Sequence, residues 1–154
     1  MSAELVIKKL KKFKATVAVA ESITGGGLGQ ALTDIAGSSE VFLGGIISYS
    51  DESKIKELGV SKTSIKKFSA VSEEVAIEMA ESVRKKFKSN YGISTTGVAG
   101  PGKAYGQKAG TVWIAISTPN DTVAIPLSLT GERKSIRQAT IESALASFSR
   151  IIAP

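Results

Sequence analysis

The chain has 154 residues, of which 42% are hydrophobic, and a formal net charge of +6. This length and composition predict one globular domain that is large enough to bury a core. The sequence contains no cysteine and no histidine, which excludes disulfides, thiolate chemistry and a histidine general base. Acid–base chemistry in this protein must therefore use Lys, Tyr, Asp or Glu.

The positive charge is dispersed in lysine pairs on predicted helix faces, which is typical of a solvated surface. No basic stripe is interleaved with aromatic residues, so nucleic acid ranks last among the expected partners. Mild attraction of an anionic small ligand fits the charge equally well. No apolar run reaches transmembrane length, and the first residues read as an amphipathic helix rather than a signal peptide. We expect a cytoplasmic protein without membrane association.

The first half of the chain is predicted to alternate helices and strands. Apolar spacing and turn residues predict helices over 3–13, from Gly25 to about Ile35, 52–58 and 61–68, and strands over 15–20 and within 41–50. Asp51 is the expected N-cap of the helix over 52–58, and Gly59 ends it.

The second half begins with a helix from Ser72 to about Lys88, with acidic residues in its first turn and basic residues in its last turns. Strands follow over 91–96, 111–117 and 122–129, the last two around a turn over 118–121, and a helix closes the chain over 131–152. Helices between the early strands imply parallel crossovers, and the late hairpin implies an antiparallel part. The order predicts an α/β fold, a three-layer α/β/α sandwich on a mixed sheet, formed as a single domain by residues 1–154.

Three turns rich in small residues suggest one pocket: Ser22–Gly27, Ala36–Ser39 and Thr95–Gly102. The first follows an apolar strand and opens a helix, where backbone N–H groups favour an anion. None of the three turns is a dinucleotide fingerprint, a phosphate-binding loop or a Gly-x-Ser-x-Gly elbow. The carboxylates are scattered rather than clustered, so neither a metal site nor a cofactor is expected.

Together these segments resemble the C-terminal domain family of the competence/damage-inducible protein CinA. The matching pieces occur in the family's order over nearly the whole chain: Ala20–Gly26, Thr33–Ser39, Tyr49–Lys54, Gly59–Val60, Ala70–Ser72, Thr96–Pro101, Gly110–Val112 and Gly131–Arg133. The sequence departs from the family at Ile23, usually Cys, at Glu132, usually Asp, and over 103–109, usually a more glycine-rich loop. The changed loop touches the pocket rim, so it puts the substrate in doubt more than the fold.

The resemblance implies an amidohydrolase, because stand-alone members of the family include nicotinamide-nucleotide amidohydrolase. The implied reaction converts nicotinamide mononucleotide to nicotinate mononucleotide and ammonia with a Ser–Lys dyad and without a metal. The composition agrees, since a Ser nucleophile with a Lys base is among the few covalent routes left without His and Cys. Lys54 is the expected base: it lies in the first turn of a helix, where the dipole disfavours a cation, and burial would lower its pKa further.

Two serines are candidate nucleophiles. Ser39 is the first choice because it matches the family's second Ser after Ala-Gly, and Ser22 is the rival at the carboxyl end of a strand, where open α/β sheets bind ligands. A straight strand over 41–50 would hold Ser39 far from Lys54, since a strand rises about 3.3 Å per residue. Either Gly44-Gly45 breaks that strand or Ser39 meets Lys54 of another subunit, and we favour a homodimer with a shared site.

The remaining candidates would bind or orient the nucleotide substrate. Tyr49 is expected to relay a proton or hold the dyad, with a core tyrosine as the alternative. Arg133 is expected to bind phosphate as a planar fork, with a surface arginine at a helix end as the alternative. The other expected substrate-binding residues are Thr24, Gly25, Gly26, Thr96, Gly97 and Gly100. For Gly25 and Gly26 the alternative is a simple tight turn.

Two other functions stay open from the sequence. One is a nucleotide-binding or interaction module without catalysis, linked to competence or DNA damage as the family's name suggests. The other is an amidase on a different pyridine or nucleotide carboxamide, which the changed loop over 103–109 permits. The candidate trio Ser39, Tyr49 and Lys54 favours the enzyme over the binding module.

Overall fold

The computed structural model describes residues 2–153 and contains one five-stranded mixed sheet. Met1 and Pro154, which the predicted domain includes, lie outside the described residues. The strands are β1 (Val17–Glu21), β2 (Phe42–Ile47), β3 (Tyr91–Gly97), β4 (Thr111–Ser117) and β5 (Thr122–Ser128). The helices are α1 (Ser2–Lys12), α2 (Gly27–Thr33), α3 (Asp51–Leu58), α4 (Lys62–Phe68), α5 (Glu73–Phe87) and α6 (Arg133–Ile151), with a short 3-10 turn, η1 (Ser38–Glu40).

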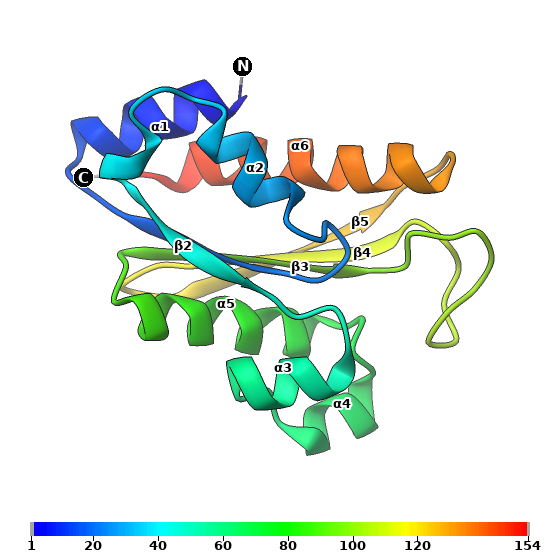
Figure 1. Ribbon diagram of the computed structural model, residues 1–154. Helices are drawn as coiled ribbons and strands as arrows, with labels where there is room; N and C mark the ends of the chain where they lie inside the picture. The colour runs from blue at the N-terminus through cyan, green and yellow to red at the C-terminus, as the bar shows by residue number, and fades with distance from the viewer. Residues whose placement is uncertain (1, 154) are drawn as a thin grey trace.

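The sheet has the order β2-β1-β3-β4-β5. Strand β1 pairs in parallel with both β2 and β3, whereas β3–β4 and β4–β5 are antiparallel. Helices α1, α2 and α6 cover one face, and α5, with α3 and α4 outside it, covers the other (Figure 1). The predicted three-layer α/β/α sandwich on a mixed sheet is confirmed.

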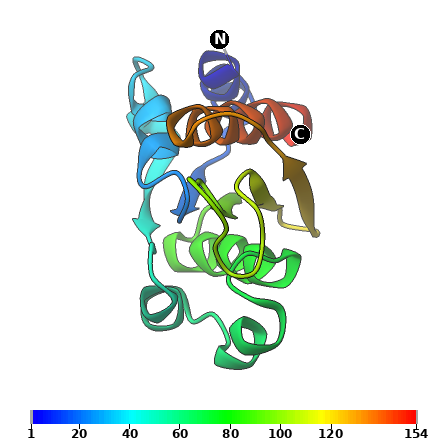
Figure 2. The same cartoon turned by 90° about the vertical axis from the view of Figure 1, so that its right-hand side faces the viewer.

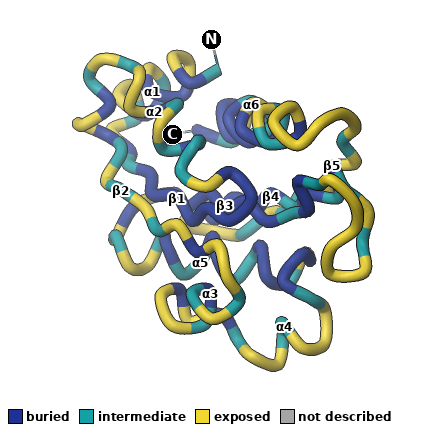
Figure 3. The backbone as a smooth tube through the Cα atoms, turned by 45° about the vertical axis from the view of Figure 1, so that its right-hand side comes forward, coloured by how far each residue is buried: buried dark blue, intermediate teal, exposed yellow. Residues whose placement is uncertain are grey.

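A core fills both faces of the sheet. Buried residues of α1, α2 and α6 pack on one face, for example Leu10, Leu28 and Phe148. On the other face Met79 and Val83 of α5 lie against β1. Strands β1 and β3 form the buried centre, whereas the segment after β3 is mostly exposed (Figure 3).

One glycine sets the close approach of α5 to the sheet. A Cβ at Gly92 in β3 would stand 2.3 Å from the carbonyl oxygen of Ala80 and 2.9 Å from Arg84 Cβ. Such contacts are far inside van der Waals distance, so only glycine lets the helix pack at this height. The tight packing fixes α5, from whose N-terminal side the chain contributes residues 70 and 71 to the pocket described below.

Several helix starts differ from the sequence prediction by one or two residues, and two of these differences lie near the pocket. Helix α2 begins at Gly27 rather than Gly25, because Gly25 (φ 58°) and Gly26 (φ 103°) are left-handed and form a turn. The N-cap of α3 is Ser50 rather than Asp51: the Ser50 side chain accepts from the Ser53 N–H in a capping box. Asp51 is instead the first residue of the helix, where its charge still favours the N-terminus.

The carboxyl ends of the three parallel strands meet at one edge of the sheet. Ser22 follows β1, the segment 48–50 follows β2, and the segment 98–110 follows β3 and stands in front of the sheet edge (Figure 2, yellow-green). Open α/β sheets bind ligands at this edge. Among the described residues, no helix has the length and apolar character needed to cross a membrane.

Candidate active site

Ser22 occupies the first position after β1, at the base of the pocket. Its backbone N–H donates to the Thr95 carbonyl at 3.0 Å, which extends the β1–β3 pairing by one residue and fixes the direction of the side chain. The residue is only 7% exposed. The hydroxyl is therefore held by the sheet rather than by a mobile loop.

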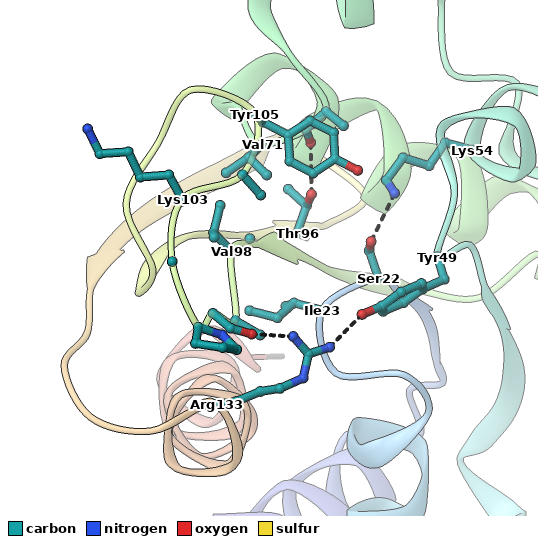
Figure 4. A pocket seen from close by; sticks show the side chains of 17 residues that line it. Ser22, Ile23, Tyr49, Lys54, Val71, Thr96, Val98, Lys103, Tyr105 and Arg133 are labelled. Carbon is teal, nitrogen blue, oxygen red and sulfur yellow. Dashed lines mark hydrogen bonds between the residues drawn. The ribbon is translucent and has the colours of Figure 1, made fainter.

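Lys54 approaches Ser22 from α3. Its side chain is 1% exposed, and its Nζ lies 2.9 Å from Ser22 Oγ and 2.9 Å from the Ser48 carbonyl oxygen (Figure 4). The capping box at Ser50 fixes the first turn of α3, so Lys54 projects back toward the end of β2. Two rigid elements thus bring a hydroxyl and an amine into hydrogen-bond contact.

Burial lowers the pKa of the Lys54 amine below its ordinary value of 10.5, because the charged form loses its hydration. The nearby Asp51 carboxylate acts in the opposite direction and is the smaller influence. The amine is thereby shifted toward the neutral form, which is the form that can accept a proton from a hydroxyl.

Above this pair lies a pocket of about 240 Å³. Its walls come from the segment after β1, the segment before α5, the end of β3 with the loop that follows, and the start of α6. Thr96 Oγ1 donates to the Ala70 carbonyl at 2.8 Å, which ties β3 to the segment before α5. The lining includes Thr96, Gly97 and Gly100, three of the expected substrate-binding residues.

Arg133 and Tyr49 stand together at the mouth of the pocket. The Arg133 guanidinium donates to Tyr49 Oη at 2.9 Å and to the Gly100 carbonyl (Figure 4). Tyr49 is 56% exposed, so it is not a core tyrosine. The pair therefore links the end of β2, the loop after β3 and the start of α6 around one opening.

Three expected substrate-binding residues lie away from the pocket. Thr24 is fully buried, and it and the Gly25-Gly26 turn are absent from the pocket lining. The anion at the start of α2 is the buried side chain of Glu21. Its carboxylate accepts from the N–H groups of Gly26, Leu28 and Gly29, at 3.2, 2.7 and 2.9 Å, and from Thr24 Oγ1 at 2.6 Å. The Glu21 carboxylate therefore occupies the position at the helix N-terminus that a ligand anion would take. Gly25 and Gly26 form a tight turn, which was the alternative prediction for these two glycines.

Ser39 also lies away from the pocket. It is exposed in η1, before β2, whereas Lys54 lies beyond the other end of that strand. Strand β2 runs unbroken through Gly44-Gly45, with a register shift opposite Val17/Ala18. Within one chain β2 separates the two side chains, and the serine in contact with Lys54 is Ser22 rather than Ser39. The alternative in which Ser39 meets Lys54 of another subunit stays a prediction.

Several pocket residues were not singled out from the sequence. They are Val71, Lys103 and Tyr105, whereas Ile23 was noted only as a departure from the family. The Ser48 carbonyl, which accepts from Lys54, was not singled out either. A backbone carbonyl leaves no mark in a sequence, and Val71 resembles any core valine. The changed loop over 103–109 was the signal that pointed to Lys103 and Tyr105. Within residues 2–153, no three acidic side chains gather in a way that could hold a metal ion.

The fold and the site together define a class: an α/β protein with a buried Ser–Lys pair at the carboxyl edge of its parallel strands. Comparison with known proteins shows the family to which this fold belongs. The family model described as the CinA C-terminal domain matches residues 1–152. The chain belongs to the CinA C-terminal domain family.

Relatives support the assignment in sequence and in structure. A putative competence-damage inducible protein of Thermoanaerobacter sp. (strain X514) is 45% identical over 143 residues, which are 92% of this chain and 35% of that protein. A CinA-like protein of Fervidobacterium nodosum is 45% identical over 136 residues, 88% of this chain and 33% of that protein. The chain thus spans about a third of the length of these relatives.

Solved structures give the same result. The competence/damage inducible protein CihA from Agrobacterium tumefaciens has a TM-score of 0.92 at 32% identity and covers 97% of this chain and 94% of its own. The CinA superfamily protein ECK1530/EC0983 from Escherichia coli has a TM-score of 0.94 at 29% identity, over 98% and 90% of the two chains.

Proposed function

We propose that this protein is an amidohydrolase that converts nicotinamide mononucleotide to nicotinate mononucleotide and ammonia. The observation that carries the proposal is the 2.9 Å contact between Lys54 Nζ and Ser22 Oγ at the base of the pocket. A hydroxyl in contact with a buried amine of lowered pKa is the arrangement of an activated serine nucleophile. Membership of the CinA family supports the substrate class through the resemblance described above.

In the first half of the reaction, neutral Lys54 takes the proton of the Ser22 hydroxyl while Oγ attacks the carboxamide carbon. The carbon becomes tetrahedral, and its oxygen takes up the electron pair of the C=O bond. Lys54 then returns the proton to the departing nitrogen, the C–N bond breaks, and ammonia leaves. The substrate's acyl group remains as an ester of Ser22.

In the second half of the reaction, a water molecule takes the place of the ammonia that has left. Lys54 removes a proton from the water, which attacks the ester carbon, and the C–Oγ bond breaks. The proton returns to Ser22 Oγ, so the dyad is regenerated and nicotinate mononucleotide is released. The Ser48 carbonyl accepts a hydrogen bond from Lys54 Nζ in both halves and keeps the amine beside Oγ.

Cationic groups at the pocket mouth suit the phosphate of the nucleotide. Arg133 lines the opening with a guanidinium already oriented by Tyr49, and Lys103 lines it from the loop. A guanidinium held in a fixed plane is well suited to bind phosphate oxygens in pairs. A cytoplasmic location fits a substrate of this kind and remains our prediction.

The test is ammonia release from nicotinamide mononucleotide by the purified protein and three variants. We expect Ser22→Ala and Lys54→Met each to lower kcat by about a thousandfold or more. The nucleophile and its base act as a unit, so removing either one abolishes the contribution of both. The matched control is Ser39→Ala, the same change at an exposed serine outside the pocket, which should retain activity.

Other outcomes would redirect the proposal. A loss in Ser39→Ala and Lys54→Met, with activity kept in Ser22→Ala, would make Ser39 the nucleophile, reaching Lys54 of a second copy in the homodimer that the sequence suggests. Binding of nicotinamide mononucleotide without ammonia release would favour the alternative function, a nucleotide-binding module that has no catalytic activity. Turnover of a different pyridine carboxamide alone would keep the dyad and replace the substrate.

A further inference from the structure

Tyr105 stands at the tip of a two-residue hairpin in the loop after β3. Ala104 and Gln107 form an isolated bridge, with reciprocal backbone hydrogen bonds of 3.0 and 2.9 Å. Tyr105 (φ 52°) and Gly106 (φ 70°) between them are both left-handed. This is the geometry of a tight hairpin turn that needs positive φ at both central positions.

Tyrosine is a poor residue for this turn. Asn, Asp and Gly suit the first central position, whereas a side chain with a bulky Cβ substituent is strained at positive φ. The backbone therefore gives no reason for a tyrosine here. A strained residue beside a pocket is a reason to ask what its side chain does.

The Tyr105 side chain is part of the pocket. It lines the same cavity as Ser22 and Lys54, and its ring projects over this cavity (Figure 4). The side chain of Gln107 donates to the Val71 carbonyl at 2.8 Å, which ties the hairpin to the body of the protein. Tyr105 is 49% exposed, so a large part of its ring surface is free to contact a ligand.

The surroundings of Tyr105 favour a flat cation. The Asp51 carboxylate lies near the Tyr105 hydroxyl, and partial burial followed by this negative charge raises the pKa of Tyr105. Asp51 Oδ1 is buried and, among the described residues, has no hydrogen-bond partner. The face of a tyrosine ring is itself electron-rich and attracts cations that lie over it.

The pyridine ring of nicotinamide mononucleotide is flat and carries a positive charge, because its nitrogen is bonded to the ribose. We propose that Tyr105 is the specificity-determining residue of this pocket, stacking on the pyridinium ring so that the carboxamide reaches Ser22. This inference rests on the proposed function. It assigns ring recognition to the loop over 103–109, whose sequence we expected to bear on the choice of substrate.

The test compares two ligands that share a sugar phosphate. Nicotinate mononucleotide has the ring, whereas ribose 5-phosphate lacks it, and calorimetry measures the Kd of each. Tyr105→Asn removes the ring and relieves the turn, so we expect Kd for nicotinate mononucleotide to rise about tenfold. The Kd for ribose 5-phosphate should stay within about twofold, and Tyr105→Phe should retain most of the ring-dependent affinity.

The matched control is Lys88→Asn. Lys88 has nearly the same strained backbone (φ 52°) but is exposed at the end of α5, away from the pocket. Both Asn variants should have a higher Tm than the unmutated protein. Only Tyr105→Asn should weaken the binding of nicotinate mononucleotide. A higher Tm together with a higher Kd in Tyr105→Asn would show that the affinity is lost because the ring is absent and not because the fold is damaged.

The inference is overturned if Tyr105→Asn leaves the Kd for nicotinate mononucleotide unchanged. It is also overturned if the Kd values for nicotinate mononucleotide and ribose 5-phosphate rise by the same factor. Ammonia release by the unmutated protein distinguishes this failure from failure of the proposed function. Turnover with an unchanged Kd in Tyr105→Asn overturns the role of Tyr105 alone. A ring-dependent loss without turnover in the unmutated protein supports Tyr105 and overturns the amidohydrolase.

Discussion

The side chain of Lys54 is almost completely buried, with its amine between Ser22 Oγ and the Ser48 carbonyl. A buried lysine reduces stability when it is charged and is useful to the reaction when it is neutral. Both properties depend on the same lowered pKa. At the scale of the residue, stability and activity should therefore change together with pH.

We predict that kcat/KM rises with pH as Lys54 loses its proton, with a midpoint below 10.5. Stability should rise from that midpoint up to about 10.5. Between the lowered folded pKa and 10.5, the unfolded chain binds more protons than the folded one, so unfolding becomes harder as pH increases. The slope is at most about 1.4 kcal/mol per pH unit for one group.

Lys54→Met is the reference for this prediction, because it removes the titrating group and keeps an unbranched side chain that is only one atom shorter. Urea unfolding at several pH values should show the rise in the unmutated protein relative to Lys54→Met. Parallel curves for the two proteins would mean that Lys54 has an ordinary pKa, and would remove the argument for a neutral amine.

At the scale of the element, the start of α2 depends on one side chain. The four donors on the buried Glu21 carboxylate include the N–H groups of Gly26, Leu28 and Gly29, which a helix start leaves without partners. Arg137 adds a second restraint, since its guanidinium donates to the carbonyls of Ile23 and Thr24, both at 3.0 Å. The segment that carries Ser22 is thus held from the inside.

We predict that Glu21→Gln lowers the free energy of unfolding by about 1–3 kcal/mol, because an amide group places a donor where one carboxylate oxygen now accepts from backbone N–H groups. The measurement is urea unfolding. The control is Glu40→Gln, the same change at an exposed ion pair with Lys11, which should cost less than about 1 kcal/mol. Equal effects in the two variants would show that Glu21 does not organise the turn.

At the scale of the whole molecule, the pocket gathers residues from segments far apart in the chain. Ser22, Tyr49, Thr96 and Arg133 come from the ends of β1, β2 and β3 and from the start of α6. A ligand that contacts all of these binds only the folded chain. Binding should therefore stabilise the molecule as a unit.

We predict that nicotinate mononucleotide at about 100 times its Kd stabilises the protein by about 2.7 kcal/mol, seen as a higher Tm. Ser22→Ala should show nearly the same shift, because the product is held mainly by the pocket walls and mouth. At this same ligand concentration Arg133→Ala should show a smaller shift, because its Kd is higher. A ligand shift lost in Ser22→Ala but kept in Arg133→Ala would contradict the assignment of phosphate to the mouth.

Among residues 2–153, the sequence alone predicted the six α-helices, the five strands and the three-layer fold, since apolar periodicity and turn residues are local signals. It also selected Lys54 and Ser22 as candidates. It did not decide between Ser22 and Ser39, because that choice depends on which side of β2 each residue occupies and on how the parallel strands align. It assigned the N–H groups of Gly25 and Gly26 to a ligand anion, whereas in the folded chain the buried carboxylate of Glu21 fills the start of α2. Contacts between residues distant in the chain are fixed only by tertiary packing, and the geometry of this pocket consists of such contacts.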